Sequence, residues 1–154
     1  MKKLMLIIIG LVLILSTVSA MAQTDTTALT ASATVMGSCS FTSVTNLDFG
    51  TYDPTNTVND DDGVGDFTFR CTRGTNYDLY ISGVRTMTDG TDTLNFDLYQ
   101  DIGRATVWAA ASPGTTGISA NNAPNTTDIY GRIPALQDVQ AGAYSGTVTV
   151  TIEY

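Results

Sequence analysis

The sequence contains no histidine among its 154 residues. Histidine is the commonest general base and a frequent metal ligand, so its absence excludes Ser-His-Asp and Cys-His catalytic sites. The two cysteines are too few for a structural zinc site, which needs four Cys or His ligands. Beyond the N-terminal segment, no stretch has the apolar period of an amphipathic helix. We therefore expect neither helices nor catalysis, and no cofactor or resident metal.

The N-terminal residues have the pattern of a secretory signal peptide. Lys2 and Lys3 precede an apolar run from Leu4 to Leu15, and small residues follow at the end of the segment. That run is short for a membrane span, and no later run is long enough. We expect residues 1–22 to be a signal peptide, cleaved after Ala22 or two residues earlier, and the rest to be exported as one domain.

Negative charge dominates the chain after this segment. Five arginines stand against fifteen acidic residues, fourteen of them Asp, which gives a formal charge of about −10. Proteins bind nucleic acids and anionic lipids through clusters of Lys and Arg. The composition therefore predicts no nucleic-acid partner, and we expect the charge to keep an exported protein soluble.

The two cysteines are Cys39 and Cys71. An exported chain meets an oxidising compartment, and a single pair has one possible connectivity, so we expect a disulfide between them. Closing this loop should contribute roughly 3–4 kcal/mol through the unfolded state. The spacing is far from Cys-x-x-Cys, which favours a structural role over a redox role.

Alternating apolar and polar residues recur along the chain, and Gly, Asn, Asp and Pro interrupt them at short intervals. This pattern is typical of an all-β sandwich. The polar stretch 111–127 is expected to be a long loop. We predict an immunoglobulin-like sandwich of about seven strands, with candidate strands at 27–37, 39–49, 64–72, 76–82, 93–100, 105–109, 128–135 and 143–154.

An acidic run from Asn59 to Gly63 raises the question of calcium. With Gly63 at the sixth position of an EF-hand loop, the first and twelfth positions become Val58 and Phe69, which cannot supply oxygen ligands. The EF-hand motif is therefore excluded. A solvated turn is the simpler interpretation, and a looser cation site at residues 59–66 stays open.

The C-terminal stretch 143–154 alternates almost without interruption. One face carries Tyr144, Val148, Val150, Ile152 and Tyr154, the other carries Ser, Thr and Glu, and Gly146 is the one gap in the apolar face. Such a strand belongs inside a sheet, and the sequence ends on its last apolar residue. We therefore expect this strand to have an edge without a partner.

A second alternating stretch lies near the N-terminus, before Cys39. Its apolar face carries Leu29, Ala31, Ala33 and Val35. This strand could fold back onto its own sheet and complete a monomer. It could also add to a sheet of a neighbouring molecule, as in strand addition between chains. Composition alone leaves both open.

Several motifs resemble the spore coat protein U-like family, which includes the subunits of archaic chaperone–usher pili. The similarity runs over nearly the whole exported chain, with both cysteines in place and the motifs in the family's order. They are ATVMGSC (33–39), LDFGTYDP (47–54), the strand at Cys71-Thr72, LYQDIGRATVW (98–108) and YGRIPALQDVQAGAYSGTVTVTIEY (130–154).

This resemblance implies an incomplete immunoglobulin-like domain at 38–154 that lacks its final strand. A periplasmic chaperone would lend a strand, an outer-membrane usher would pass the subunit outward, and the N-terminal segment 23–37 of another pilin subunit would replace the chaperone. Carried onto this chain, the donor residues are Leu29, Ala31, Ala33 and Val35. The acceptor groove is formed by Val148, Val150, Ile152 and Tyr154, with Phe41 as a further contributor.

The resemblance also implies a function: a structural subunit of a cell-surface pilus, secreted through the periplasm, that polymerises by donor-strand exchange and supports adhesion and biofilm. No lysine follows Lys3, so lysine-based covalent cross-links between subunits are excluded, and a polymer would be held non-covalently. Two rivals remain: a self-contained secreted binding module, and a coat or matrix protein of the same fold.

Overall fold

The computed structural model describes residues 21–154, and the chain divides into two units between Ala33 and Thr34. The expected signal peptide lies outside the described residues except for its last two positions. Residues 21–33 are exposed and contain no helix or strand. The second unit is built of β-strands, and the described part of the chain contains no helix that could cross a membrane.

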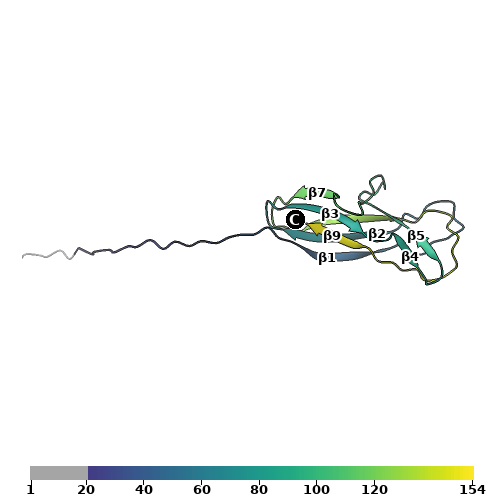
Figure 1. Ribbon diagram of the computed structural model, residues 1–154, viewed down its shortest axis with the longest axis horizontal. Helices are drawn as coiled ribbons and strands as arrows, with labels where there is room; N and C mark the ends of the chain where they lie inside the picture. The colour runs from purple at the N-terminus through teal and green to yellow at the C-terminus, as the bar shows by residue number, and fades with distance from the viewer. Residues whose placement is uncertain (1–20) are drawn as a thin grey trace, which may run out of the picture. The chain divides into compact units, whose positions relative to one another are not determined.

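Nine strands make up the second unit, which confirms the all-β class (Figure 1). They form a four-stranded sheet of order β1-β2-β8-β6, a three-stranded sheet of order β7-β3-β9, and a β4-β5 ribbon, all antiparallel. Their bounds are β1 (Cys39–Asp48), β2 (Val64–Cys71), β3 (Asn76–Ser82), β4 (Thr86–Thr88), β5 (Thr93–Asn95), β6 (Asp97–Tyr99), β7 (Thr115–Ile118), β8 (Asn125–Arg132) and β9 (Thr149–Glu153).

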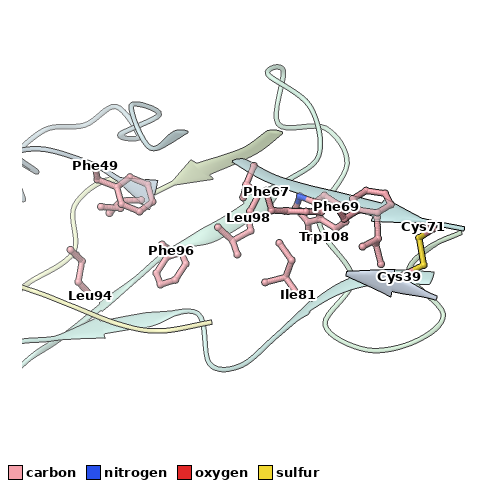
Figure 2. Close-up of a cluster of buried hydrophobic side chains, with 13 residues drawn as sticks. Cys39, Phe49, Phe67, Phe69, Cys71, Ile81, Leu94, Phe96, Leu98 and Trp108 are labelled. Carbon is pink, nitrogen blue, oxygen red and sulfur yellow. A yellow bond between two sulfur atoms is a disulfide. The ribbon is translucent and has the colours of Figure 1, made fainter. Parts of the chain in front are cut away.

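A single core lies between the two sheets, as in an immunoglobulin-like sandwich. Phe67 and Phe69 of β2 point into it from one sheet, and Leu79 and Ile81 of β3 from the other. In the candidate strands 64–72 and 76–82, alternation places these residues on one face of each strand. The buried core residues are Cys39, Phe49, Phe67, Phe69, Cys71, Leu79, Ile81, Leu94, Phe96, Leu98, Trp108, Ile129 and Ile133 (Figure 2).

The expected disulfide is present. Cys39 and Cys71 are direct partners across β1 and β2, and their sulfur atoms are bonded. In Figure 2 this bond lies at one end of the core, whereas Phe49 and Leu94 lie at the other. We call these the disulfide end and the far end of the sandwich.

Two predicted strands have a different form. The stretch 93–100 is interrupted at Phe96, because β5 pairs with β4 whereas β6 pairs with β8 of the four-stranded sheet. No strand forms at 105–109. There, the backbone N–H of Trp108 donates to the carbonyl of Leu98, and the carbonyl of Ala109 accepts from Ile81, so this stretch links the two sheets.

Three further expectations are wrong in detail. The predicted loop 111–127 contains β7 and the first residues of β8, where Thr and Asn pair with neighbouring strands despite their polarity. Strand β4 has no counterpart among the predicted strands. Residues 27–37 do not form a strand. Local propensity cannot predict such elements when pairing partners decide whether they form.

The C-terminal strand is shorter than predicted. Strand β9 pairs with β3, and Ser145 pairs separately with Thr88 of β4 through two backbone hydrogen bonds. Pairing therefore passes from β3 to β4 across Gly83, whose φ of 114° is open to glycine and strained for other residues. Gly146 allows a close backbone approach, since a Cβ there would lie 2.2 Å from the carbonyl oxygen of Thr86.

Candidate functional site

The C-terminal segment has backbone partners along one edge only. Strand β9 is the last strand of its sheet, and Ser145 continues the same pairing onto β4. Its core-facing residues Val148, Val150 and Ile152 pack against the core but are only half-buried. Opposite them in the register lie Ile81 and Leu79, which are buried. The apolar face of β9 is thus incompletely covered along the edge that has no backbone partner.

Strand β1 is the edge strand of the other sheet and pairs with β2 alone. A β-bulge between Phe41 and Ser43 shifts its alternation, so that Val44 is the partner of the inward-facing Phe67. Yet 59% of Val44 and 36% of Phe41 is exposed, whereas Phe67 is fully buried. The core-facing side chains of Phe41 and Val44 are therefore not fully covered by other residues of the domain.

The free edges of β1 and β9 lie on the same side of the sandwich. On the opposite side, Thr115 of β7 is hydrogen-bonded to Gln100, which follows β6, so those two strands are neighbours. A hollow at the far end has Leu47 of β1 and Tyr144, which precedes β9, among its lining residues. We give the name acceptor groove to the free edges of β1 and β9 together with the incompletely covered core-facing side chains beside them; Figure 1 draws the two strands.

The hollow at the far end has a volume of about 570 Å³. Apolar side chains form much of its wall, and it opens onto the end of the core that contains Phe49 and Leu94. A second hollow, at the disulfide end, is lined by Val35, Arg73 and Tyr154 among others. The sandwich therefore has a hollow at each end.

The predicted acceptor residues lie on or beside edge strands of two different sheets. Val148, Val150 and Ile152 share one face, and Phe41 lies on the facing edge strand. Tyr154 follows β9 at the disulfide end and is 63% exposed. Sequence reasoning missed Val44, because strict alternation from Cys39 places Val44 outward and nothing in the sequence marks the bulge.

The predicted donor residues are divided between the two units. Leu29, Ala31 and Ala33 belong to the first unit, and Val35 belongs to the second. All four are exposed, with 94% of Leu29 and 81% of Val35 accessible to solvent. Four exposed apolar side chains thus lie at alternate positions in a segment that forms no strand of its own.

Two of the sequence motifs pack against each other beside the far-end hollow. The ring of Phe49, from the LDFGTYDP motif, fits against Gly131 of the YGRIPAL motif, where a Cβ would lie 2.5 Å from the ring. The hydroxyl of Tyr52 donates to the carbonyl of Pro134 at 3.0 Å. These contacts hold the segment after β1 against the end of β8 and thereby shape one wall of the hollow.

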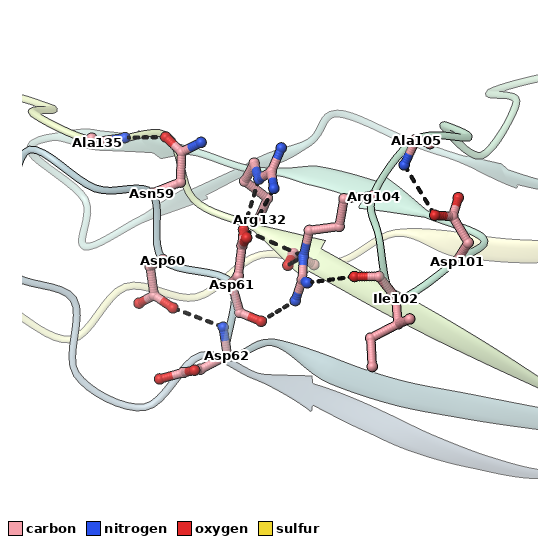
Figure 3. Close-up of polar contacts among 11 residues, drawn as sticks. Asn59, Asp60, Asp61, Asp62, Asp101, Ile102, Arg104, Ala105, Arg132 and Ala135 are labelled. Carbon is pink, nitrogen blue, oxygen red and sulfur yellow. Dashed lines mark hydrogen bonds and ion pairs between the residues drawn. The ribbon is translucent and has the colours of Figure 1, made fainter.

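The acidic run at Asn59–Gly63 has a structural role (Figure 3). Arg132 binds the Asp61 carboxylate in a bidentate manner, at 2.7 and 2.8 Å. Arg104, whose side chain is 8% exposed, lies 3.3 Å from the same carboxylate and donates to the carbonyl of Gly131. The hydrogen bond from Arg132 and the positive charge of Arg104 lower the pKa of Asp61. Asp61 therefore anchors this turn to β8 through arginine.

The residues on either side of Asp61, Asp60 and Asp62, form the turn itself. Asp60 accepts the backbone N–H of Asp62 and exchanges backbone hydrogen bonds with Ile133. Within residues 21–154, no three acidic, His or Cys side chains are grouped so as to hold a metal ion. In the looser cation site considered for residues 59–66, the central carboxylate is that of Asp61. It is already bound by the guanidinium groups of Arg104 and Arg132.

The fold and its two free edges define a class: an all-β sandwich with an incompletely covered core. The profile of the Spore Coat Protein U domain family matches residues 25–151, and the chain belongs to this family. It is 30% identical over 162 aligned positions to Protein U of Myxococcus xanthus, covering 86% of this chain and 87% of that protein.

Among solved structures, similarity is found to a chain of the CsuC–CsuE chaperone–tip adhesion subunit pre-assembly complex from the archaic chaperone–usher Csu pili of Acinetobacter baumannii. The TM-score is 0.49 and the identity 20%, over 79% of this chain. This chain spans 40% of the length of that chain.

Proposed function

We propose that this protein is a structural pilus subunit that polymerises by donor-strand exchange. The observation that carries the proposal is the open acceptor groove, in which core-facing Phe41 and Val44 of β1 face the half-buried apolar side of β9 across two unpaired edges. An added strand would pair with both edges and cover these side chains. The donor is Leu29–Val35 of another copy.

The energetics support this assignment. Burying one Leu, one Val and two Ala side chains stabilises the complex by on the order of 4–7 kcal/mol. Each backbone hydrogen bond to the free edges adds about 1 kcal/mol. A donor strand held along its whole length would leave slowly, which suits a non-covalent fibre.

The same free edges account for the proposed partners. An exported chain with two unpaired apolar edges is prone to aggregate. A periplasmic chaperone that lends a strand would protect the acceptor groove, and an outer-membrane usher would then present the subunit to the next donor segment. The proposed product is a cell-surface pilus that supports adhesion and biofilm, with no catalytic step.

The proposal is tested by moving the donor segment. Residues 24–37 are deleted from the front and appended after Tyr154 through a short flexible linker. We expect a monomer that melts more than about 10 °C above the chain lacking the segment, because the added burial is worth several kcal/mol. Melting is followed by circular dichroism, and oligomeric state by gel filtration.

A matched control appends the same segment with Leu29→Thr and Val35→Thr, which keeps strand propensity but removes the two largest apolar groups. It should recover less than half of the gain. If the segment gives no gain in either form, or if the unaltered chain is a stable monomer with its own segment in the groove, the protein is instead a self-contained module.

A further inference from the structure

Two of the five arginines lie near the disulfide end, where Glu153 also precedes Tyr154. Near the disulfide end, Arg70 and Arg73 are exposed on either side of Cys71. Among the described residues, neither arginine takes part in an ion pair, since the only pairs formed there join Asp61 to Arg104 and Arg132. The disulfide end thus presents two free cations.

The far end presents acidic residues around the apolar hollow. Asp48 lines it, Asp53 lies between the lining residues Tyr52 and Pro54, and Asp138 precedes the lining residue Val139. All three are exposed. Asp89 and Asp92 also lie near the hollow, since both accept hydrogen bonds from Gln140, another lining residue. Their carboxylates add to the negative charge there. We call Asp48, Asp53 and Asp138 the acidic rim.

Two carboxylates near the hollow, those of Asp53 and Asp89, are held in the charged form. Hydrogen bonds from the hydroxyl and the backbone N–H of Thr55 lower the pKa of Asp53. Backbone N–H groups of Asp92 and Thr91 lower the pKa of Asp89. Within residues 21–154, none of the rim residues has an arginine partner. The far end is therefore a negatively charged opening around an apolar recess.

The base of the donor segment is close to the free arginines. Val35 and Arg73 line the same hollow at the disulfide end. Only three residues separate Val35 from Cys39, and four residue steps span at most about 14 Å. A copy whose Val35 is inserted in a neighbour must therefore bring Arg73 and its own disulfide end against that neighbour.

We infer that successive copies meet end to end, with the disulfide end of the donor copy seated on the far end of the acceptor copy. This inference rests on the proposed donor-strand polymer. Val35 of the donor copy enters the apolar hollow, and Arg70 and Arg73 face the acidic rim. The occupant of the hollow is thus a second copy of this chain.

Charge selects this polarity. A donor inserted in the opposite direction would bring two disulfide ends together, and the arginines of one copy would face the arginines of the other. Like charges at close approach disfavour that arrangement, whereas opposite charges steer the preferred one. The contact would therefore set the direction of the fibre in addition to stabilising it.

The test measures polymer growth of the full exported chain after refolding, by light scattering and native electrophoresis, at about 50 mM and about 0.5 M NaCl. We expect the Arg70→Glu/Arg73→Glu variant, and separately the Asp48→Lys/Asp53→Lys/Asp138→Lys variant, to grow about ten-fold more slowly at low salt. The deficit should largely disappear at high salt. Combining both sets restores opposite charges and should return growth to within about two-fold of the parent chain.

The matched control, Asp62→Lys/Asp66→Lys/Asp97→Lys, makes the same charge change away from the rim and should grow as the parent chain does. The milder pair Arg70→Gln/Arg73→Gln serves if a reversal variant fails to fold, and it should abolish the salt dependence. The end-to-end contact is refuted if the combined variant grows no faster than either single set, or if the control slows equally.

A peptide of residues 24–37 separates this result from the proposed function. If the peptide blocks growth of the parent chain while the charge reversals have no effect, donor-strand insertion stands and the end-to-end contact is wrong. If the peptide neither binds nor blocks growth, the proposed function fails, and the inference fails with it.

Discussion

Val44 and Phe67 are direct partners across β1 and β2, yet 59% of Val44 is exposed and Phe67 is fully buried. Both side chains face the core. Phe67 is covered by other core side chains, including Trp108 at a ring-centroid distance of 5.9 Å, whereas Val44 lies at the edge where cover is missing. This difference between paired residues locates the gap that we assign to a donor strand.

Val44→Ser tests that gap. With the donor segment appended after Tyr154, the substitution should lower stability by about 1–2 kcal/mol, because the donor buries Val44. In the chain without the segment the effect should be less than about 0.5 kcal/mol. Thermal melting of both forms measures the difference. Val58→Ser, at an exposed loop position, is the control and should change neither form; equal losses at Val44 in both forms would contradict the assignment.

Asp61→Asn removes the counter-charge of two arginines. Arg104 is nearly buried and would be left with carbonyl partners alone, but Asp61 itself is 39% exposed, so water screens part of the loss. We expect a destabilisation of about 1–2 kcal/mol, between the values for surface and buried pairs. Urea unfolding measures it. Asp62→Asn, whose side chain has no such partner, should be neutral, and an equal effect there would exclude the ion pairs as the cause.

The pH dependence of stability has a definite sign at Asp61. Hydrogen bonding to Arg132, with Arg104 nearby, lowers the folded-state pKa of Asp61 below its ordinary 3.8. Its stabilising contribution is therefore complete above the unfolded pKa and is lost as the pH falls through the folded pKa. The difference in stability between the parent chain and Asp61→Asn should be constant near neutral pH and shrink below about pH 4. Melting curves across this range decide it; a difference that grows on acidification would reverse the sign.

Gly146→Ala tests the close approach between the C-terminal segment and β4. The added Cβ would meet the Thr86 carbonyl oxygen at 2.2 Å, and backbone cannot yield as a side chain can. We expect a loss of about 1–3 kcal/mol from the forced separation of the two segments. Gly103→Ala is the control, because its nearest neighbour is the Asp101 carboxylate at 3.2 Å, and it should cost much less. Equal costs would mean that glycine acts here only through chain entropy.

The sequence predicted the strands whose alternation is uninterrupted. Phe67, Phe69, Leu79 and Ile81 lie where period-two patterning places them, because a strand that buries one face must alternate. The sequence predicted less well those continuous stretches in which the first part pairs with one strand and the rest with another, as on the two sides of Phe96 and Gly146. Such changes depend on residues far away in the sequence, which local patterns do not contain.

The features of the candidate site likewise fall into those that the sequence predicts and those that only the folded structure reveals. The sequence by itself determined the all-β class, the Cys39–Cys71 bond and the apolar face of the C-terminal strand, since composition, cysteine number and alternation are local properties. Only the tertiary structure decided that a bulge turns Val44 inward, that Asp61 is bound by arginine, and that free arginines and the acidic rim lie at opposite ends. The physical reason is that register, burial and charge separation arise when distant strands pair.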